Sequence, residues 1–521
     1  MSALKAFTLL KTGDYRLNEE QPPLSKILAG LPLLFINPHL DPSWVDDKQW
    51  DFSHKFFFES GNNPDLILFL ARVPFILMGV ILGIYVYKWS KELFGLNAGL
   101  LSLFFYTFSP NIIAHSRLAA TDFLVTAFVF ISFYYFYKYL KHKSKTSLYI
   151  SGIIFGFALS SKFTSLYMLP VFFIYIFLHT NSIKKSAKYL PSILILFILS
   201  FFVLSLTYSF KINVFLDGLH QVIVGGTIGR FSYLLGKHYI GRSLLYFPIA
   251  FLFKTPIPFL IILIVFKKYE LKKSKFLFVP VLFFFLVSLL NKTNLGLRHI
   301  LVIYPFLHVY AGNIIKLKKE SLKLIFGFLL LWYGFSSLFI FPNYLAYFNE
   351  LSLGPNNGYK ILIDSNLDWG QDLKQLSHYL RDNNIDEIYI SYFGNDDLDY
   401  RIIKYQPLEC KPTTGIIAIS VNQLIGIRES VAACNNWLMG FQPVKKIGYT
   451  IWVFNITKEF TPEDIKRHEL QYNEALNREY LLLTSLRVQE CEAMCESNCK
   501  SIGKQYLRSE LSEDKCLCKC V

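Results

Sequence analysis

Two stretches of the chain place carboxylates and basic groups beside the start of a long apolar run. The first, RLNEEQPPLSKILAGLPLL at 16–34, sets Glu19, Glu20 and Lys26 around a proline pair, which lets the chain enter a helix from an extended conformation. The second, AHSRLAATDFLVTAF at 114–128, puts Asp122 at the mouth of an apolar run, two turns after His115 and Arg117. Taken alone, solvated glutamates and an aspartate N-cap explain these residues equally well.

Two further stretches bring only basic groups. LGKHYIGRSLLYFPIAFLFKTPIPFL, at 235–260, has Lys237 and His238 before an apolar run and Lys254 inside it, next to a TPIP sequence that breaks a helix. NKTNLGLRHILVIYP, at 291–305, carries Arg298 and His299 at the start of another run. Snorkelling is the structural alternative for Lys254 and Arg298.

The combination of these groups is typical of chemistry at a phosphate. Arginine and lysine neutralise a phosphate leaving group, while a carboxylate takes a proton from an attacking hydroxyl or holds a divalent metal. A transporter would show polar residues near the middle of the membrane and internal repeats, and we find no such repeat. Ionisable groups at a membrane boundary are costly to hold, so these stretches are candidates for function.

The composition is that of a membrane protein. The chain has 521 residues, of which 53% are hydrophobic and 17% aromatic. Two shorter apolar runs lie near 147–160 and 163–179. Eight runs are long enough to span a bilayer, and they lie near 66–88, 96–114, 121–140, 188–210, 244–266, 275–291, 299–315 and 322–342.

Lysine clusters alternate with lysine-poor connections between these runs, and the net charge is +15. By the positive-inside rule the lysine-rich loops are cytoplasmic, so the four stretches above and the C-terminal part face outward. The lysines are not interleaved with aromatic residues on a basic face, so the charge is a topology signal and not a nucleic-acid site. We expect a multi-pass protein of the inner (plasma) membrane with an external, periplasmic C-terminal domain.

All eight cysteines lie in the part of the chain that reads as water-soluble, six of them in the tail CEAMCESNC…CLCKC. An even set on the external side favours disulfides in an oxidising compartment, with metal ligation by thiolates as the alternative.

Five motifs together resemble the lipid-carrier-dependent C-type glycosyltransferases, the superfamily of protein O-mannosyltransferases and lipid A aminoarabinose transferases. They are LKTGDYRLNEEQPPLSKILAGLPLL, HSRLAATDFLVTAF, YFPIAFLFKTPIPFL, LGLRHILVIYPFL and PNYLAYFNELSLGPNNGYKILIDSNLDWGQDLKQLSHYL. The resemblance runs from about Ala6 to Asn455. It implies transfer of a sugar from a polyprenyl phosphate to a hydroxyl of a protein, lipid or glycan on the external side, with inversion.

The resemblance also implies residue roles. Asp122 and Glu20 are the predicted catalytic carboxylates and the predicted ligands of a divalent cation (Mg, Mn or Zn). The carrier phosphate is predicted to meet Arg298, with Lys254, Lys26, Gln21, Lys237 and His238 around it. The family's principal Asp-Glu pair lies upstream of TGDYRLN, and the sequence begins after it, so we expect a truncated start. Gln21 stands where relatives commonly carry histidine or lysine.

The expected fold is mostly α. We predict external and interfacial segments at 1–64, a membrane helix bundle at 65–342, a small external α/β domain at 343–458 and a helical cysteine-rich tail at 459–521. DSNLDWGQD is either a capped turn around Trp369 or a surface for the acceptor or the carrier headgroup, which would use Asp364, Asn366, Asp368, Trp369, Gln371 and Asp372.

The predicted partners are a polyprenyl-phosphate-linked sugar, an acceptor and membrane lipids. Two alternatives stay open at this point. The first is an inactive or non-enzymatic scaffold that binds or transports lipid-linked sugars, and the second is an oligosaccharide transferase or polymerase.

Overall fold

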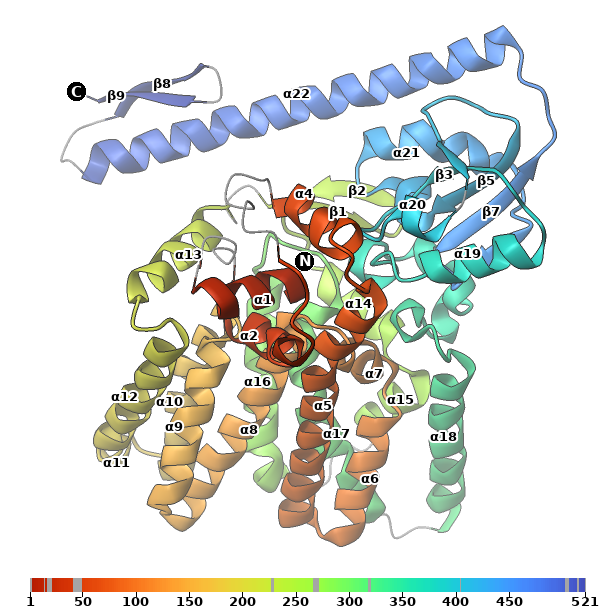
Figure 1. Cartoon of the computed structure of the whole chain (residues 1–521). Coiled ribbons are helices and arrows are strands. Elements are labelled where there is room, and N and C mark those ends of the chain that lie inside the picture. Colours follow the sequence, from red (N-terminus) through yellow and green to blue (C-terminus); the bar gives the residue numbers. More distant parts are fainter. Residues whose placement is uncertain are drawn as a thin grey trace. The chain divides into compact units, whose positions relative to one another are not determined.

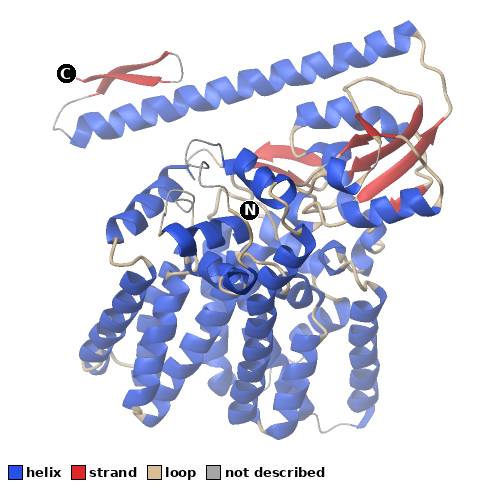
Figure 2. Cartoon of the chain, in the orientation of Figure 1, coloured by secondary structure: helices blue, strands red, loops and turns tan. Residues whose placement is uncertain are grey.

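The computed structural model describes residues 2–13, 15, 21–40, 49–225, 229–265, 271–316, 320–402, 404–501, 506–512 and 515–520. Two compact units make up the chain (Figures 1 and 2). The helical unit comprises Met1–Ile223, Leu244–Leu290 and Gly296–Pro355, and the sheet unit comprises Val224–Ser243, Asn291–Leu295 and Asn356–Val521. Each unit is described by itself.

The helical unit is built of apolar helices (Figure 1). Four described helices are long and apolar enough to cross a membrane, and two bent helix pairs raise the number to six if each pair is one span. The chain is therefore a multi-pass membrane protein. The longer helices are α5 (Pro64–Phe94), α6 (Leu96–Thr107), α8 (Thr121–His142), α9 (Lys145–Leu159), α10 (Met168–Thr180), α12 (Leu190–Thr207), α13 (Ile212–Gly225), α16 (Leu271–Leu289) and α18 (Glu320–Phe339).

Shorter helices complete this unit. They are α1 (Ser2–Thr12), α2 (Leu24–Gly30), α3 (Leu33–Ile36), α4 (Gln49–His54), α7 (Pro110–Ser116), α11 (Ile183–Ala187), α14 (Tyr246–Lys254), α15 (Ile257–Val265) and α17 (Tyr304–Gly312). Two 3₁₀ helices, η4 (Phe163–Tyr167) and η5 (Leu297–Ile303), precede α10 and α17. Three of the eight predicted spans, near 66–88, 121–140 and 188–210, are single described helices long enough to cross a bilayer, and those near 96–114 and 244–266 are the bent pairs. Phe163–Thr180 is also long enough, although a shorter run was predicted there.

Small residues allow α9 and α12 to pack closely. Gly152 and Gly156 lie one turn apart on α9, and a Cβ added at Gly156 would come within 2.6 Å of the Val203 Cβ and 2.8 Å of the Ser200 carbonyl oxygen. Without a hydrophobic driving force between helices in lipid, such small-residue stripes let two backbones gain van der Waals contact. The pair therefore has no room for a larger side chain at this crossing.

Two sharp bends interrupt the apolar helices. The α6–α7 pair bends by 65° and the α14–α15 pair by 110°. Pro256 follows the second break and cannot donate a backbone hydrogen bond. Asn349 compensates, since its Nδ2 donates to the carbonyls of Leu252 (2.6 Å) and Thr255 (2.7 Å). Carbonyls that the break releases are thus satisfied within the protein, as a bilayer requires.

The sheet unit contains a five-stranded mixed sheet in the order β4-β3-β5-β7-β6. Strands β3 (Ile388–Ser391), β4 (Tyr405–Pro407) and β5 (Gly415–Ser420) are parallel, whereas β7 (Ile451–Ile456) and β6 (Lys445–Ile447) pair antiparallel to their neighbours. Helix α19 (Leu373–Asp382) covers one face with a leucine stripe. The core on this face consists of Leu373, Leu376, Leu380, Ile388, Ile390, Ile402, Ala418, Ile447, Ile451 and Val453.

Two hairpins and three helices also belong to the sheet unit. The hairpin of β1 (Phe231–Leu234) and β2 (Lys237–Ile240) comes from a connection between two membrane helices. Helix α20 (Leu398–Arg401) and helix α21 (Glu429–Asn435) follow β3 and β5. The chain ends with the 40-residue helix α22 (Pro462–Ser501) and the hairpin of β8 (Tyr506–Ser512) and β9 (Lys515–Cys520).

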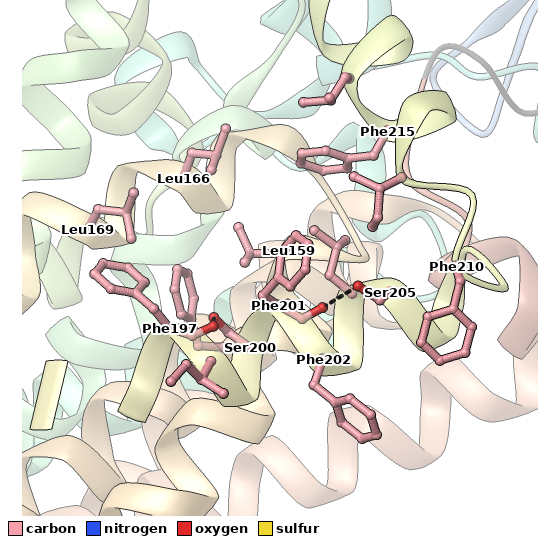
Figure 3. Close-up of a pocket in the computed structure, with 15 residues that line it drawn as sticks. Leu159, Leu166, Leu169, Phe197, Ser200, Phe201, Phe202, Ser205, Phe210 and Phe215 are labelled. Atoms are coloured by element: carbon pink, nitrogen blue, oxygen red, sulfur yellow. Dashed lines mark hydrogen bonds between the residues drawn. The ribbon is translucent and has the colours of Figure 1, made fainter. Parts of the chain in front are cut away.

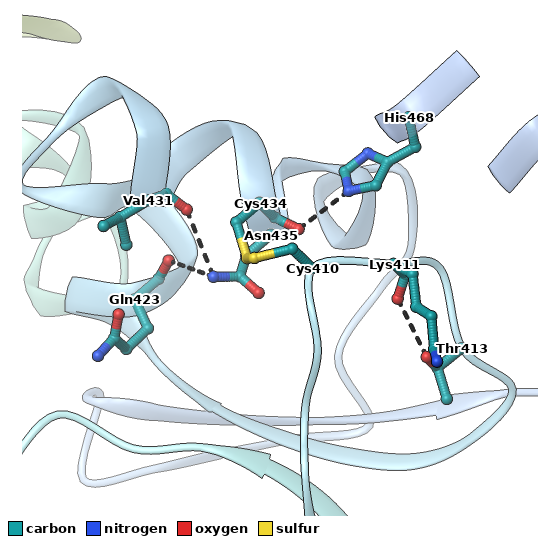
Figure 4. Close-up of a disulfide and its surroundings, with 8 residues drawn as sticks. All are labelled: Cys410, Lys411, Thr413, Gln423, Val431, Cys434, Asn435 and His468. Carbon is teal, nitrogen blue, oxygen red and sulfur yellow. Dashed lines mark hydrogen bonds between the residues drawn. A yellow bond between two sulfur atoms is a disulfide. The ribbon is translucent and has the colours of Figure 1, made fainter. Parts of the chain in front are cut away.

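A disulfide joins Cys410 to Cys434 in α21 (Figure 4). The Cys434 carbonyl accepts a hydrogen bond from Nε2 of His468 in α22 (3.1 Å), and Asn435 Nδ2 donates to the Gln423 carbonyl (3.0 Å). Cys491 is also disulfide-bonded, and no described cysteine is free. The predicted disulfides are confirmed for these residues. The predicted fold class, a mostly α membrane bundle with a small α/β domain and a cysteine-rich tail, is confirmed as well.

Replacing Gly156 with alanine tests the α9–α12 crossing. We expect G156A to lower the free energy of unfolding by about 1–3 kcal/mol, the usual cost of overpacking a tight interface. Gly327 of α18 provides a matched control, because an added Cβ there meets nothing within 4 Å. Thermal unfolding of both variants in detergent measures the effect, and equal midpoints would contradict the packing argument.

Candidate active site

A buried ion cluster, formed by Asp122, Lys162 and Arg298, lies in the helical unit. Lys162 Nζ donates to Asp122 Oδ1 at 2.6 Å, and Arg298 Nη1 lies 3.4 Å from Asp122 Oδ2. The side chains of Asp122 and Lys162 are 4% and 10% exposed, whereas the Arg298 side chain is 23% exposed. One carboxylate is thus held by two cations.

Local structure explains how these three residues meet. Helices α8 and α9 are joined by Lys143 and Ser144 alone, so the chain reverses and the end of α9 returns to the level where α8 begins. Asp122 lies in the first turn of α8 and Lys162 lies just after α9. Arg298 lies in η5, which packs on α8. An antiparallel pair of spans is what brings residues 40 positions apart into contact.

Asp122 is not a helix cap. The N-cap of α8 is Ala120, and no side chain caps this end of the helix, while Asp122 lies one residue inside. A carboxylate in a first turn is favoured by the helix dipole, but burial makes it costly unless it is paired. The two cations are therefore needed for the carboxylate to stay charged.

Further basic side chains lie close to the cluster. Its two cations share one carboxylate, and the ring of His299 is buried beside them, with no hydrogen-bond partner for its Nε2 among the described residues. The charges of Asp122, Lys254 and Arg298 also act together on the buried ring of His115. A cluster of this kind attracts an anion.

Lys254, a predicted phosphate ligand, is buried at the end of α14 in the same unit. Its Nζ donates to the Leu345 carbonyl at 2.7 Å and lies 4.5 Å from the centroid of the Phe348 ring. The Asn111 side chain holds the Lys254 carbonyl at 2.6 Å. The bend that Asn349 stabilises therefore positions this lysine.

The stretch with Gln21 and Lys26 adjoins the cluster. Lys26 is buried in α2 and its Nζ donates to the Gln21 carbonyl at 3.2 Å. The Leu24 backbone N–H donates to the Ser160 carbonyl at 2.9 Å, two residues before Lys162. Glu19 and Glu20 lie outside the described residues, so the predicted role of Glu20 stays a prediction.

Sequence reasoning missed Lys162 and Asn349. Lys162 follows the shorter apolar run near 147–160, and the positive-inside rule places the end of that run on the external side. A single lysine at the external end of an apolar run was the signal that could have identified it. Asn349 is a neutral amide in a loop, and no sequence pattern indicates that it donates hydrogen bonds to the carbonyls at the α14–α15 bend.

The remaining predicted residues lie in the sheet unit. Lys237 is exposed on β2, and His238 Nε2 donates to the Gly426 carbonyl at 2.9 Å, which attaches the β1–β2 hairpin to the segment before α21. Their predicted contact with the carrier phosphate stays a prediction.

The DSNLDWGQD segment is largely internal. Asn366, Asp368 and Asp372 are buried, and Asp372 Oδ2 accepts from Thr450 Oγ1 at 2.6 Å. Asp368 Oδ1 accepts from the Gly370 N–H at 2.7 Å, and its own carbonyl accepts from Asn422 Nδ2 at 3.1 Å. These bonds fix the loop on the sheet. The half-buried Asp364, Trp369 and Gln371 remain for the predicted acceptor surface.

The ion cluster does not fit a metal site. Among the described residues, no three His, Cys, Asp or Glu side chains are grouped to hold a metal ion. Both oxygens of Asp122 already face cations, which would repel a divalent ion. The divalent cation predicted from the sequence, with Glu20 as its second ligand, stays a prediction, and we derive no step through it.

An apolar cavity of about 720 Å³ lies among α9, η4, α10, α12 and α13 (Figure 3). Its lining includes Leu159, three residues before Lys162 in the sequence, and Phe215, whose ring centroid lies 5.2 Å from that of Phe163. Apart from Ser200 and Ser205, its lining is apolar; it comprises Phe155, Leu159, Leu166, Leu169, Phe197, Ile198, Phe201, Phe202, Leu204, Phe210, Ile212, Phe215 and Leu216.

Comparison with known proteins supports the resemblance read from the sequence. A family model described as dolichyl-phosphate-mannose-protein mannosyltransferase matches residues 67–205. This segment carries the mannosyltransferase pattern. It contains Asp122 and Lys162 but not Arg298, and the resemblance to lipid-carrier-dependent glycosyltransferases is confirmed over this segment.

Other matches are more distant. An uncharacterized protein of Aquifex aeolicus (strain VF5) is 29% identical over 127 residues, which cover 24% of this chain and 26% of that protein. ArnT from Cupriavidus metallidurans bound to undecaprenyl phosphate aligns over 88% of this chain and 94% of its own, with 11% identity and a TM-score of 0.44. Oligosaccharyltransferase AglB from Archaeoglobus fulgidus aligns over 83% and 66%, with 9% identity and a TM-score of 0.39.

Asp368 gives the sheet unit a pH dependence. Burial raises the pKa of this carboxyl from 3.8 to about 8, with the charges of Asp372 and Asp364 adding to the effect. Because the folded pKa is the higher one, the stabilisation is complete below pH 3.8 and is lost as the pH rises towards 8. The free energy of unfolding should fall by at most about 1.4 kcal/mol per pH unit over this range.

Asp368→Asn, which mimics the protonated acid, should flatten this slope. Thermal midpoints of wild type and variant between pH 5 and 8 measure the difference. Identical slopes in the two proteins would show that Asp368 does not titrate in this window.

Proposed function

We propose that this chain is a membrane glycosyltransferase that moves a sugar from a polyprenyl-phosphate carrier to a hydroxyl of an acceptor. As the sequence predicts, the acceptor is a protein, lipid or glycan on the external side, and the anomeric centre is inverted. The observation that carries the proposal is the ion cluster, since two of its three members lie in the segment that matches the mannosyltransferase family.

The charge of the cluster suits the carrier phosphate. A phosphate monoester leaves when the sugar is transferred, and preorganised cations stabilise the charge that develops on it. Lys162 and Arg298 place an ammonium group and a guanidinium group beside the same carboxylate, and both groups are preferred ligands of a phosphate. In this proposal both cations contact the phosphate oxygens, and Lys254 and Lys26 add to the field from nearby elements.

Asp122 has two roles in the proposal. It holds Lys162 and Arg298 in place in the free protein, and it accepts the proton of the attacking hydroxyl once the phosphate takes over the cations. The acceptor oxygen forms the new bond to the anomeric carbon while the bond to the phosphate oxygen breaks, so the phosphate leaves with the electron pair. Glu20 is the second predicted carboxylate for this proton transfer.

The apolar cavity suits the isoprenoid chain of the carrier. Its lining includes Leu159, three residues before Lys162 in the sequence, and in this proposal the phosphate lies at the cluster and the first isoprene units lie against Leu159, Phe163 and Phe215. Burial of such a chain is favourable by about 25 cal/mol per Å² of apolar surface removed from water. Binding energy from this remote part of the donor then helps to orient the reacting centre.

Neutralising Lys162 tests the role of the cluster in catalysis. We expect Lys162→Gln to reduce turnover by about 10²–10³-fold, the usual effect of removing one group that stabilises a developing negative charge. Lys162→Arg, which keeps the charge, should retain more activity than the glutamine variant. The assay follows release of carrier phosphate from radiolabelled polyprenyl-phosphate sugars in membranes that contain the chain.

Lys145→Gln is the matched control, because Lys145 is exposed at the other end of α9. The double variant Asp122→Asn, Lys162→Gln removes both members of the buried pair, so neither of these two side chains is left charged without the other. Lipid binding without turnover in wild type would favour the scaffold over the enzyme. Equal turnover in Lys162→Gln and Lys145→Gln would remove the ion cluster from the mechanism.

A further inference from the structure

A pair of lysines shares one aromatic platform in the sheet unit, away from every residue used above. Lys446 Nζ lies 3.8 Å from the centroid of the Trp452 ring and 5.7 Å from that of Tyr359. Lys360 Nζ lies 5.8 Å from the same Tyr359 centroid. The two rings meet edge to face at 5.0 Å. We call these four residues the lysine–aromatic patch.

The backbone holds the patch in place. Lys446 is directly opposite Trp452 in the β6–β7 register, so the two side chains share a face of the sheet. Ile451 and Val453 point to the other face, into the core beneath α19. Residue 361, next to Lys360, accepts a hydrogen bond from the Leu235 N–H at 2.9 Å. Strand pairing fixes the backbone at Lys446, and the hydrogen bond at residue 361 fixes the backbone next to Lys360.

The electrostatics of the patch are unfavourable as it stands. No carboxylate among the described residues pairs with either ammonium group. Burial lowers the pKa of Lys446, and the charge of Lys360 lowers it further. Cation–π contacts offset part of this cost, about 0.5–2 kcal/mol each. The repulsion between these two charges is relieved when an anion binds near them.

We propose that the lysine–aromatic patch binds a phosphate group. Two ammonium groups match the double negative charge of a phosphate monoester, whereas a single carboxylate would leave one positive charge uncompensated. The rings of Tyr359 and Trp452 border the site with apolar surface, which suits the carbon skeleton that carries the phosphate. This phosphate belongs either to a soluble phosphorylated sugar or to a lipid headgroup.

Lysine footprinting of the full chain in maltoside micelles tests the site directly. Acetylation of each lysine is measured by mass spectrometry with glucose 6-phosphate, with glucose, and with chloride at equal ionic strength, which controls for screening. We expect the phosphate compound to protect Lys360 and Lys446 at least fivefold. Lys445, exposed on the same edge strand and on the opposite face, serves as the internal control and should be unaffected.

A second arm replaces glucose 6-phosphate with phosphatidic acid, a lipid whose headgroup is a phosphate monoester, added to the micelles. Protection by the soluble compound assigns a free phosphorylated sugar, and protection by the lipid alone assigns a headgroup. In calorimetry, Lys360→Gln and Lys446→Gln should each weaken binding about tenfold, while Lys445→Gln should not; thermal midpoints verify that the variants fold. Protection in neither arm, or equal protection of Lys445, would overturn the proposal. Glycosyltransferase activity enters none of these measurements.

Discussion

The buried carboxylate of Asp122 is the constraint on which the helical unit depends. A charge in an apolar surrounding must be paired or neutralised, and here the pairing is supplied by Lys162 from the end of α9 and Arg298 from η5. Asp122 and its two partners come from three separate segments of the chain. The bundle must therefore assemble before these contacts can form. The same assembly places an ammonium group and a guanidinium group beside one carboxylate. Stability and the proposed phosphate chemistry thus use the same three side chains.

A second constraint comes from the backbone. A membrane helix that bends by 110° exposes carbonyl groups that lipid cannot satisfy. Asn349 satisfies two of them and thereby fixes the position of Lys254. Gly152 and Gly156 let α9 pack closely on α12, and both helices line the apolar cavity. The site is therefore supported by residues that carry no charge.

The sheet unit follows the rules of a water-soluble domain. Its core is a leucine stripe packed on alternating strand residues, and buried polar groups such as Asp368 and Asp372 are tied to the backbone or to Thr450. The disulfide between Cys410 and Cys434 lies where α22 attaches through His468. A partly buried ammonium group without a carboxylate partner among the described residues, such as that of Lys446, is therefore a candidate for contact with an anionic ligand.

The sequence by itself located apolar helices and the sheet domain, and it singled out Asp122 and Arg298 as candidate site residues. Hydropathy over about 20 residues and the alternation of apolar and polar residues in strands are local properties. They can therefore be read from the sequence without knowledge of the fold. Only the tertiary structure decided which cations meet Asp122, that Lys162 is the nearer one, and that Asn349 supports the bend. Contacts between residues 40 to 176 positions apart depend on how helices pair, and no local pattern records that pairing. The long-range pairing of charges is what turns separate stretches into one candidate site.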